Sequence, residues 1–186
     1  MDLKEVIVNQ RAIYIKQLQE FYLVRENGAK EILLAYTTKE PVLLFNLSRM
    51  DYLEQVDGEY KIEELPPDTY MSHQPVVFQQ GNLSVSLHPF FWHGCEFVLQ
   101  PSLADTNFIE NWAKKWLDED ETLGPSGEGF SNAIHNVTIP ENTESKTKFT
   151  VDFGTASEDC FMELIEVFEK NGVQSVTINS FDLTTT

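Results

Sequence analysis

The chain has 186 residues, a formal net charge of −17 and a sequence pI of about 4.4. So large a negative charge repels nucleic acids and anionic membranes and attracts basic surfaces, so we expect neither nucleic acid nor membrane among its partners. Hydrophobic residues make up 41% of the chain and aromatic residues 12%, which is enough apolar material for a core and excludes a fully disordered acidic chain.

The length fits one domain of ordinary size. The first residues lack the basic and apolar segments of a signal peptide, and no stretch reaches the ~18 apolar residues of a membrane-spanning helix. Cys95 and Cys160 lie far apart among apolar residues, without the spacing of a metal or redox motif. We therefore expect a cytoplasmic protein with two reduced structural thiols and with no metal or other cofactor.

Residues 1–89 are expected to form mainly β-structure after an initial helix. Residues 3–20 fit a helical apolar stripe, and we favour a helix there although Ile13 and Ile15 also alternate as in a strand. Beyond residue 20, tight-turn dipeptides between apolar runs indicate antiparallel hairpins. The expected strands are 21–26 and 30–37 around Asn27-Gly28, then 42–47, then 52–56 and 60–64 around Asp57-Gly58, and finally 76–78 and 83–87 around Gln80-Gly81-Asn82.

Residues 90–186 alternate strands with helices. One helix is expected to begin at a cap on Asp105 or Thr106 and to end near Leu117, and a second to run from Ser157 to an Asn171-Gly172 stop. With strands expected at 90–99, 130–139, 148–153 and 173–178, the order is β-α-β-β-α-β, which is the ferredoxin-like order. The predicted fold class is α+β, with an antiparallel β-meander in residues 1–89 and the β-α-β-β-α-β half in residues 90–186, packed as one compact unit.

The negative charge is concentrated in the second half of the chain. Residues 1–93 carry 8 Lys+Arg and 13 Asp+Glu, whereas residues 94–186 carry 5 and 17. Its densest part, residues 118–121, directly follows the first predicted helix of that half, where the helix dipole disfavours anions by about 0.3–1 kcal/mol. The run is either a helix end in solvent or a recognition patch for a basic partner, and the two tryptophans before it are core residues or interface anchors. The candidate partner-binding residues are Trp112, Trp116, Asp118, Glu119, Asp120 and Glu121.

A second candidate site comprises His93, His135 and Asp152. On the predicted strand 90–99, His93 shares an apolar face with Cys95, and His135 also alternates with apolar neighbours, so a structural role is the simpler interpretation of each histidine. Asp152 is expected on the face opposite His93, so a catalytic His–Asp pair would require one of these assignments to be wrong. No three ligands converge for a metal, and the Gly-rich loop 124–129 lacks the Lys and Ser/Thr of a phosphate loop.

These observations support three hypotheses about function. The first is a non-enzymatic acidic binding protein that recognises a basic protein partner, of the immunity or inhibitor type, by analogy of charge, size and structural class rather than by any matched motif. The second is a small-molecule-binding protein or an enzyme with a cleft between the two halves, in which His93, His135 and Asp152 would lie. The third is a structural or regulatory subunit whose charge provides solubility. We favour the first.

Overall fold

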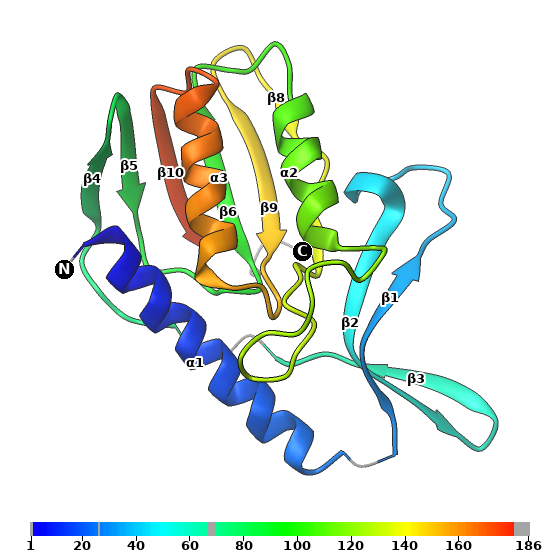
Figure 1. Ribbon diagram of the computed structural model, residues 1–186. Helices are drawn as coiled ribbons and strands as arrows, with labels where there is room; N and C mark the ends of the chain where they lie inside the picture. The colour runs from blue at the N-terminus through cyan, green and yellow to red at the C-terminus, as the bar shows by residue number, and fades with distance from the viewer. Residues whose placement is uncertain (1, 26, 67–69, 181–186) are drawn as a thin grey trace.

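The computed structural model describes residues 2–25, 27–66 and 70–180, and its architecture is α+β (Figure 1). Within those residues, three α-helices accompany a three-stranded antiparallel sheet and a seven-stranded mixed sheet. The elements are α1 (Leu3–Leu23), β1 (Ala29–Ala35), the 3-10 turn η1 (Leu44–Asn46), β2 (Leu47–Val56), β3 (Glu59–Glu63), β4 (Val76–Gln80), β5 (Leu83–Leu87), β6 (Cys95–Gln100), α2 (Asn107–Leu117), β7 (Asn136–Val137), β8 (Glu141–Asn142), β9 (Thr147–Asp152), α3 (Glu158–Lys170) and β10 (Ser175–Ser180).

Helix α1 forms where the sequence predicts it and is longer than expected. Its buried stripe continues past Leu18 to Phe21 and Tyr22, because these side chains occupy the next helical positions on the same face. Their burial in the core extends the helix through residues that the sequence assigns to a strand. The strand predicted at 21–26 is therefore wrong, and Asn27-Gly28 lies in the connection between α1 and β1 rather than in a hairpin.

The three-stranded sheet is built around the predicted Asp57-Gly58 turn. Strands β2 and β3 pair antiparallel on either side of it, and both turn residues have positive φ (53° and 88°), as a two-residue hairpin requires. Strand β1 pairs antiparallel with the other edge of β2. The strand predicted at 42–47 is wrong, because Phe45 and Asn46 have positive φ (60° and 53°) and turn the chain before β2 begins.

The seven-stranded sheet contains strands from both halves of the chain. The predicted hairpin β4–β5 forms one edge, and β10 pairs parallel with β5 and antiparallel with β6. Strand β6 lies between β10 and β9 and is antiparallel to both, while β9 also pairs with β7 and β8. A single hydrophobic cluster includes buried residues of α1 and β2 together with those of α2, α3 and the large sheet, so the two halves share one core.

The strands predicted at 90–99 and 130–139 are much shorter in the structure, where they correspond to β6 and β7. Phe90 and Trp92 are buried in the segment that precedes β6, on either side of the less buried Phe91, so they alternate in burial as in a strand without belonging to one. The segment before β7 is irregular, and its backbone N–H groups donate to carbonyl groups at the ends of α2 and β9. In both places a loop buries apolar side chains. The sequence pattern of such a loop resembles that of a strand, so the pattern alone does not distinguish the two.

Helices α2 and α3 lie side by side on one face of the seven-stranded sheet, and α1 crosses beside α3 (Figure 1). Both ends of α3 agree with the sequence, since Ser157 is its N-cap and Asn171 its C-cap, followed by Gly172 with positive φ (76°). No helix in the described residues is both long and apolar enough to cross a membrane. The core between the helices and the sheet is mainly aromatic, and its largest buried side chains are Trp92, Phe97, Phe149, Phe153, Phe161 and Phe168.

Candidate functional site

Helix α2 ends in the predicted acidic run, whose first residue has a structural role. Asp118 has positive φ (49°), which turns the chain away from the helix axis. Its buried carboxylate accepts hydrogen bonds from the Thr122 hydroxyl at 2.8 Å and from the backbone N–H groups of Thr122 and Leu123 at 2.7 and 3.0 Å. Asp118 therefore holds the loop after α2 in place and offers little of its charge to a partner.

The two tryptophans before the run lie in the core. Trp112 and Trp116 are only 3% and 6% exposed. The Trp112 indole N–H donates to the Cys160 carbonyl, and the Trp116 indole N–H donates to the Glu163 carboxylate, both at 3.2 Å. These bonds tie α2 to α3, which is the core role that the sequence also allows. The accessible part of the predicted partner-binding surface is therefore residues 119–121.

Residues 119–121 are three consecutive exposed acids, and we call them the acidic tip. None of their carboxylates forms an ion pair with any residue in the described part of the chain. The acids on the neighbouring helix are partly neutralised by lysines, so uncompensated charge is denser at the tip. The ion pairs of α3 are Lys115–Glu163 at 2.6 Å, Lys170–Glu166 at 3.2 Å and Lys4–Asp159 at 3.8 Å.

A hollow of about 320 Å³ lies between the acidic tip and the first two strands. It is formed by both halves of the chain, as the second hypothesis about function requires of a cleft. The residues expected in such a cleft, His93, His135 and Asp152, do not line it. Its charged lining residues are Lys30, Glu31, Arg49, Asp118 and Glu121.

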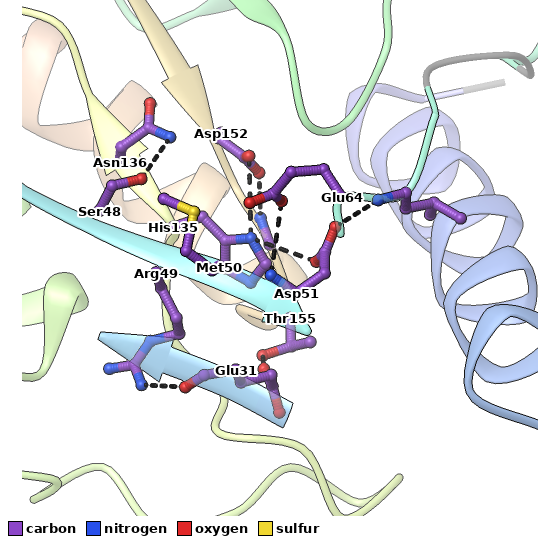
Figure 2. A network of polar contacts seen from close by, with 12 residues as sticks. Glu31, Ser48, Arg49, Met50, Asp51, Glu64, His135, Asn136, Asp152 and Thr155 are labelled. Atoms are coloured by element: carbon purple, nitrogen blue, oxygen red, sulfur yellow. Dashed lines mark hydrogen bonds and ion pairs between the residues drawn. The ribbon is translucent and has the colours of Figure 1, made fainter. Parts of the chain in front are cut away.

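A cluster of polar side chains lies where the two sheets meet, and we call Asp51, Glu64, His135 and Asp152 the junction cluster; Asp51 and His135 are buried, Asp152 is half-buried and Glu64 is exposed. Figure 2 shows their side chains converging from β2, the segment after β3, the segment before β7 and the end of β9. The Nδ1 atom of His135 is 3.5 Å from Asp51 Oδ1 and 3.7 Å from Asp152 Oδ2. The His135 side chain is 1% exposed, and neither ring nitrogen forms a hydrogen bond within the described part of the protein.

Asp51 is the centre of the junction cluster. Its Oδ1 atom accepts a hydrogen bond from the Tyr14 hydroxyl at 3.3 Å, and its Oδ2 atom accepts one from the Leu65 backbone N–H at 2.7 Å. The Asp51 backbone N–H donates to Glu64 Oε2 at 3.4 Å, so the Glu64 carboxyl group lies against β2 although part of the residue is exposed. A single aspartate thereby joins α1, β2 and the segment after β3.

No lysine or arginine in the described residues forms an ion pair with the junction cluster. Arg49 lies nearby, but its guanidinium donates to the backbone carbonyls of Glu31 and Leu117 at 2.9 and 3.0 Å. The Glu31 carboxylate in turn accepts hydrogen bonds from Ser131 and from the Thr155 hydroxyl. The buried Asp51 and the half-buried Asp152 thus lack, among the described residues, the cation that normally accompanies buried carboxylates.

Gly154 provides the space that the His135 ring occupies. It has positive φ (46°), and a Cβ atom at this position would overlap the imidazole. Its backbone N–H also donates to Asp152 Oδ1 at 2.9 Å. The turn between β9 and α3 is therefore shaped around the buried histidine and one of its two carboxylate neighbours.

Burial and like charge determine the protonation of the junction cluster. Burial, followed by the charge of Asp51, raises the pKa of Glu64 from its ordinary 4.5 to about 8. Burial and Asp51 also raise the pKa of Asp152. Burial lowers the pKa of His135 below 6.5 and outweighs the opposing charge of Asp51. Burial and like charge therefore favour the neutral imidazole of His135 and the protonated forms of Glu64 and Asp152.

His135 and Asp152 lie close together in the structure. Alternation of side chains along the predicted strands places Asp152 on the face of the sheet opposite His93 and does not predict this contact. The residues before β7 are not in a strand, so alternation does not determine where His135 points. His93 lies in the turn before β6 and stacks on Tyr14, with the ring centroids 5.7 Å apart. Since the Tyr14 hydroxyl reaches Asp51, all three residues of the second predicted site lie around the same aspartate and tyrosine.

Sequence reasoning missed Asp51, Glu64 and Tyr14. The one available signal was Asp51, an acidic residue between Met50 and Tyr52 in a segment of high β-propensity. Tyr14 belongs to the apolar stripe of a predicted helix, and Glu64 is one of two successive glutamates at the end of a predicted strand. Nothing local marks either residue as a neighbour of Asp51.

The chemistry available to these residues is limited. The described residues contain no group of three or more His, Cys, Asp or Glu side chains that could hold a metal ion. Cys95 and Cys160 are buried free thiols, and burial raises the pKa of each, so both are poor nucleophiles.

Comparisons with models of known protein families, with curated proteins and with solved structures found no match to this chain. A function for the protein has to be argued from its own charges, contacts and geometry. Fold class does not provide that argument, because one architecture serves many unrelated functions.

Proposed function

We propose that this protein is a non-enzymatic acidic binding protein that recognises a basic protein partner, of the immunity or inhibitor type. The observation that carries the proposal is the acidic tip, where three adjacent exposed carboxylates have no ion-pair partner in the described residues. They stand at the C-terminal end of α2, where the helix dipole disfavours anions by about 0.3–1 kcal/mol. Residues that lower the stability of the fold are expected at binding sites rather than at surfaces with only a structural role.

The surroundings of the tip are suited to electrostatic recognition. The hydrogen bonds of Asp118 hold the loop, so the tip presents its carboxylates from a fixed backbone. The ion pairs on α3 are exposed, and partner lysines or arginines can exchange with Lys115 and Lys170 at little cost. The net charge of −17 attracts a basic partner at long range, and such steering raises association rates by roughly 10–10³.

We also propose a ferredoxin-like arrangement for the C-terminal half and a cytoplasmic location. The first is supported by the position of β6 between β9 and β10 and by the two helices on one face of the sheet. The second is supported by two cysteines that are both free and buried. A rigid sheet with its helices on one side would hold the acidic tip as a preformed surface.

The experiment compares two triple charge reversals with the same change in net charge. Glu119→Lys/Asp120→Lys/Glu121→Lys alters the acidic tip, and Glu40→Lys/Glu141→Lys/Glu144→Lys alters exposed acids elsewhere. The wild-type chain is immobilised, retained proteins are identified by mass spectrometry, and the association rate of each purified candidate is measured with all three proteins. We expect a basic partner whose association rate falls at least about tenfold between low and ~0.5 M salt.

The tip variant should lose this binding, whereas the control variant should keep most of it. An association rate that does not depend on salt, or an equal loss in both variants, would show that net charge or another surface is responsible. Binding by neither basic proteins nor any other protein would favour the third hypothesis, in which the charge serves solubility.

A further inference from the structure

A hollow of about 600 Å³ lies between the last turns of α1, the start of β1 and Phe130, and we call it the apolar groove. Its apolar lining residues are Tyr22, Leu23 and Phe130. Leu23 is 77% exposed. An isolated exposed leucine is common on protein surfaces, whereas a leucine that lines a hollow together with two aromatic rings is typical of a site that another molecule covers.

The apolar groove continues into the smaller hollow beside the acidic tip. Lys30 and Phe130 line both hollows, and Glu121 of the acidic tip lines the smaller one. A molecule that contacts the tip therefore reaches the groove along one continuous surface. Protein interfaces combine an apolar centre with a charged or polar rim, and the groove and the tip supply these two parts side by side.

The Gly-rich loop 124–129 holds the wall that the two hollows share. The Ser126 N–H donates to the Phe130 carbonyl at 2.8 Å, and the Phe130 N–H donates to the Ser126 hydroxyl at 3.2 Å, which closes the end of the loop. Glu128, between these two residues, pairs with Arg11 of α1 at 2.9 Å. The Phe130 ring lies against the Tyr22 ring, with the centroids 5.9 Å apart. A groove fixed in this way needs little rearrangement to accept a partner, which lowers the entropic cost of binding.

Negative charge increases along this surface from the groove toward the tip. At the groove, Lys16 is opposed by Glu20 at 4.0 Å, and the Lys30 ammonium lies 4.6 Å from the centroid of the Tyr22 ring. Further along, the charged residues are Glu31, Arg49, Asp118 and Glu121 of the smaller hollow and then the rest of the acidic tip. The gradient favours one orientation of a partner, with its apolar side chain at the groove and its basic residues at the tip.

We propose that the basic partner inserts an aliphatic or aromatic side chain into the apolar groove while its lysines or arginines meet the acidic tip. The inference rests on the proposed function and adds the apolar half of the recognition surface. The two halves act on different rates. Exposed charges act mainly on association, whereas an apolar side chain that leaves water on binding acts mainly on dissociation.

The test uses one substitution in the groove and one beside it. Leu23→Ala shortens the exposed side chain in the groove, and Val24→Ala is the matched control, since Val24 is 79% exposed and does not line either hollow. Surface plasmon resonance of the captured basic partner should show a dissociation rate about tenfold higher for Leu23→Ala than for the wild type. Val24→Ala should dissociate as the wild type does.

Salt separates the two halves of the surface. The ratio of the dissociation rates of Leu23→Ala and the wild type should be the same at ~0.15 and ~0.5 M salt, because burial of apolar surface is not screened. The loss of association rate in the acidic-tip variant should shrink over the same range. A ratio for Leu23→Ala that falls with salt would overturn the assignment of the groove as an apolar anchor.

The outcomes separate this inference from the proposed function. A partner that responds to the acidic-tip variant, but dissociates from Leu23→Ala within twofold of the wild-type rate or equally fast from Val24→Ala, overturns the inference alone. A partner that responds to Leu23→Ala and not to the tip variant, or the absence of any partner, overturns both. Light scattering of the chain alone supplies a further check, since a dimer that Leu23→Ala dissociates would assign the groove to a second copy of this chain.

Discussion

The aromatic core beneath α2 and α3 and the junction cluster between the two sheets are held together by different forces. In the core, rings pack at centroid distances such as 5.2 Å for Phe97–Phe149 and 5.1 Å for Phe153–Phe161. This packing depends on volume and buried area and is indifferent to pH. In the junction cluster, polar atoms from four segments meet at defined distances, and their interactions depend on protonation.

The largest effect is expected in the aromatic core. Phe97→Ala removes a fully buried ring that contacts the rings of Phe149, Phe153, Phe161 and Phe168, and should lower the free energy of unfolding by about 3–5 kcal/mol. Urea unfolding at pH 6 and pH 9 should give the same loss at both values.

The exposed residue Leu23 provides the control for that substitution. Leu23→Ala removes a side chain that is 77% exposed and should change stability by no more than about 0.5 kcal/mol. A loss for Phe97→Ala that differed between the two pH values would contradict the distinction between a packed core and a protonation-dependent junction.

An intermediate effect is expected at the boundary of the junction cluster. Gly154→Ala places a methyl group where the His135 ring lies and forces alanine into positive φ, so we expect a loss of about 2–3 kcal/mol in thermal or urea unfolding. Gly127→Ala, where a Cβ atom meets nothing within 4 Å, should stay within about 0.5 kcal/mol of the wild type.

A double-mutant cycle tests whether His135 is the cause. In a His135→Ala background, Gly154→Ala should cost clearly less than it does in the wild type, because the overlapping ring is gone. Equal costs in the two backgrounds would mean that backbone strain alone accounts for the loss and that the turn is not shaped around the histidine.

The smallest effect on stability is expected at the acidic tip. Neutralising it with Glu119→Gln/Asp120→Asn/Glu121→Gln removes anions from the C-terminal end of a helix and should stabilise the protein by up to about 1 kcal/mol at low salt. The gain should shrink in ~0.5 M salt, where exposed charges are screened. A loss of stability would show that the carboxylates have structural partners and would weaken the case for a binding role.

Much of the fold could be predicted where one local pattern determines one element. The stripes of α2 and α3, the Asp57-Gly58 turn and the hairpin between β4 and β5 follow from helical spacing or from the need for positive φ. Predictions were wrong where burial in the tertiary structure overrode local pattern. Phe21 and Tyr22 prolong α1, and Phe90 and Trp92 fill the core from a turn.

The candidate sites could be predicted to different degrees for the same reason. The acidic tip is contiguous in sequence, so its charge and exposure could be anticipated. The sequence left open whether Trp112 and Trp116 are core residues, and nothing in it indicated the burial of Asp118. The junction cluster is assembled from segments that are far apart in the chain. The sequence suggests His93, His135 and Asp152 as one candidate site, but nothing in it points to Asp51 and Glu64 beside them.

The sequence by itself determined the α+β class, the positions of most helices and hairpins, and the uneven distribution of negative charge. These properties depend on residues that are close together in the chain, or on a simple sum of charges. The tertiary structure alone decided which carboxyl groups face one another, which indoles are buried and which charges lack a partner in the described residues. Such properties depend on distances between segments separated by tens of residues, and only the folded chain sets those distances.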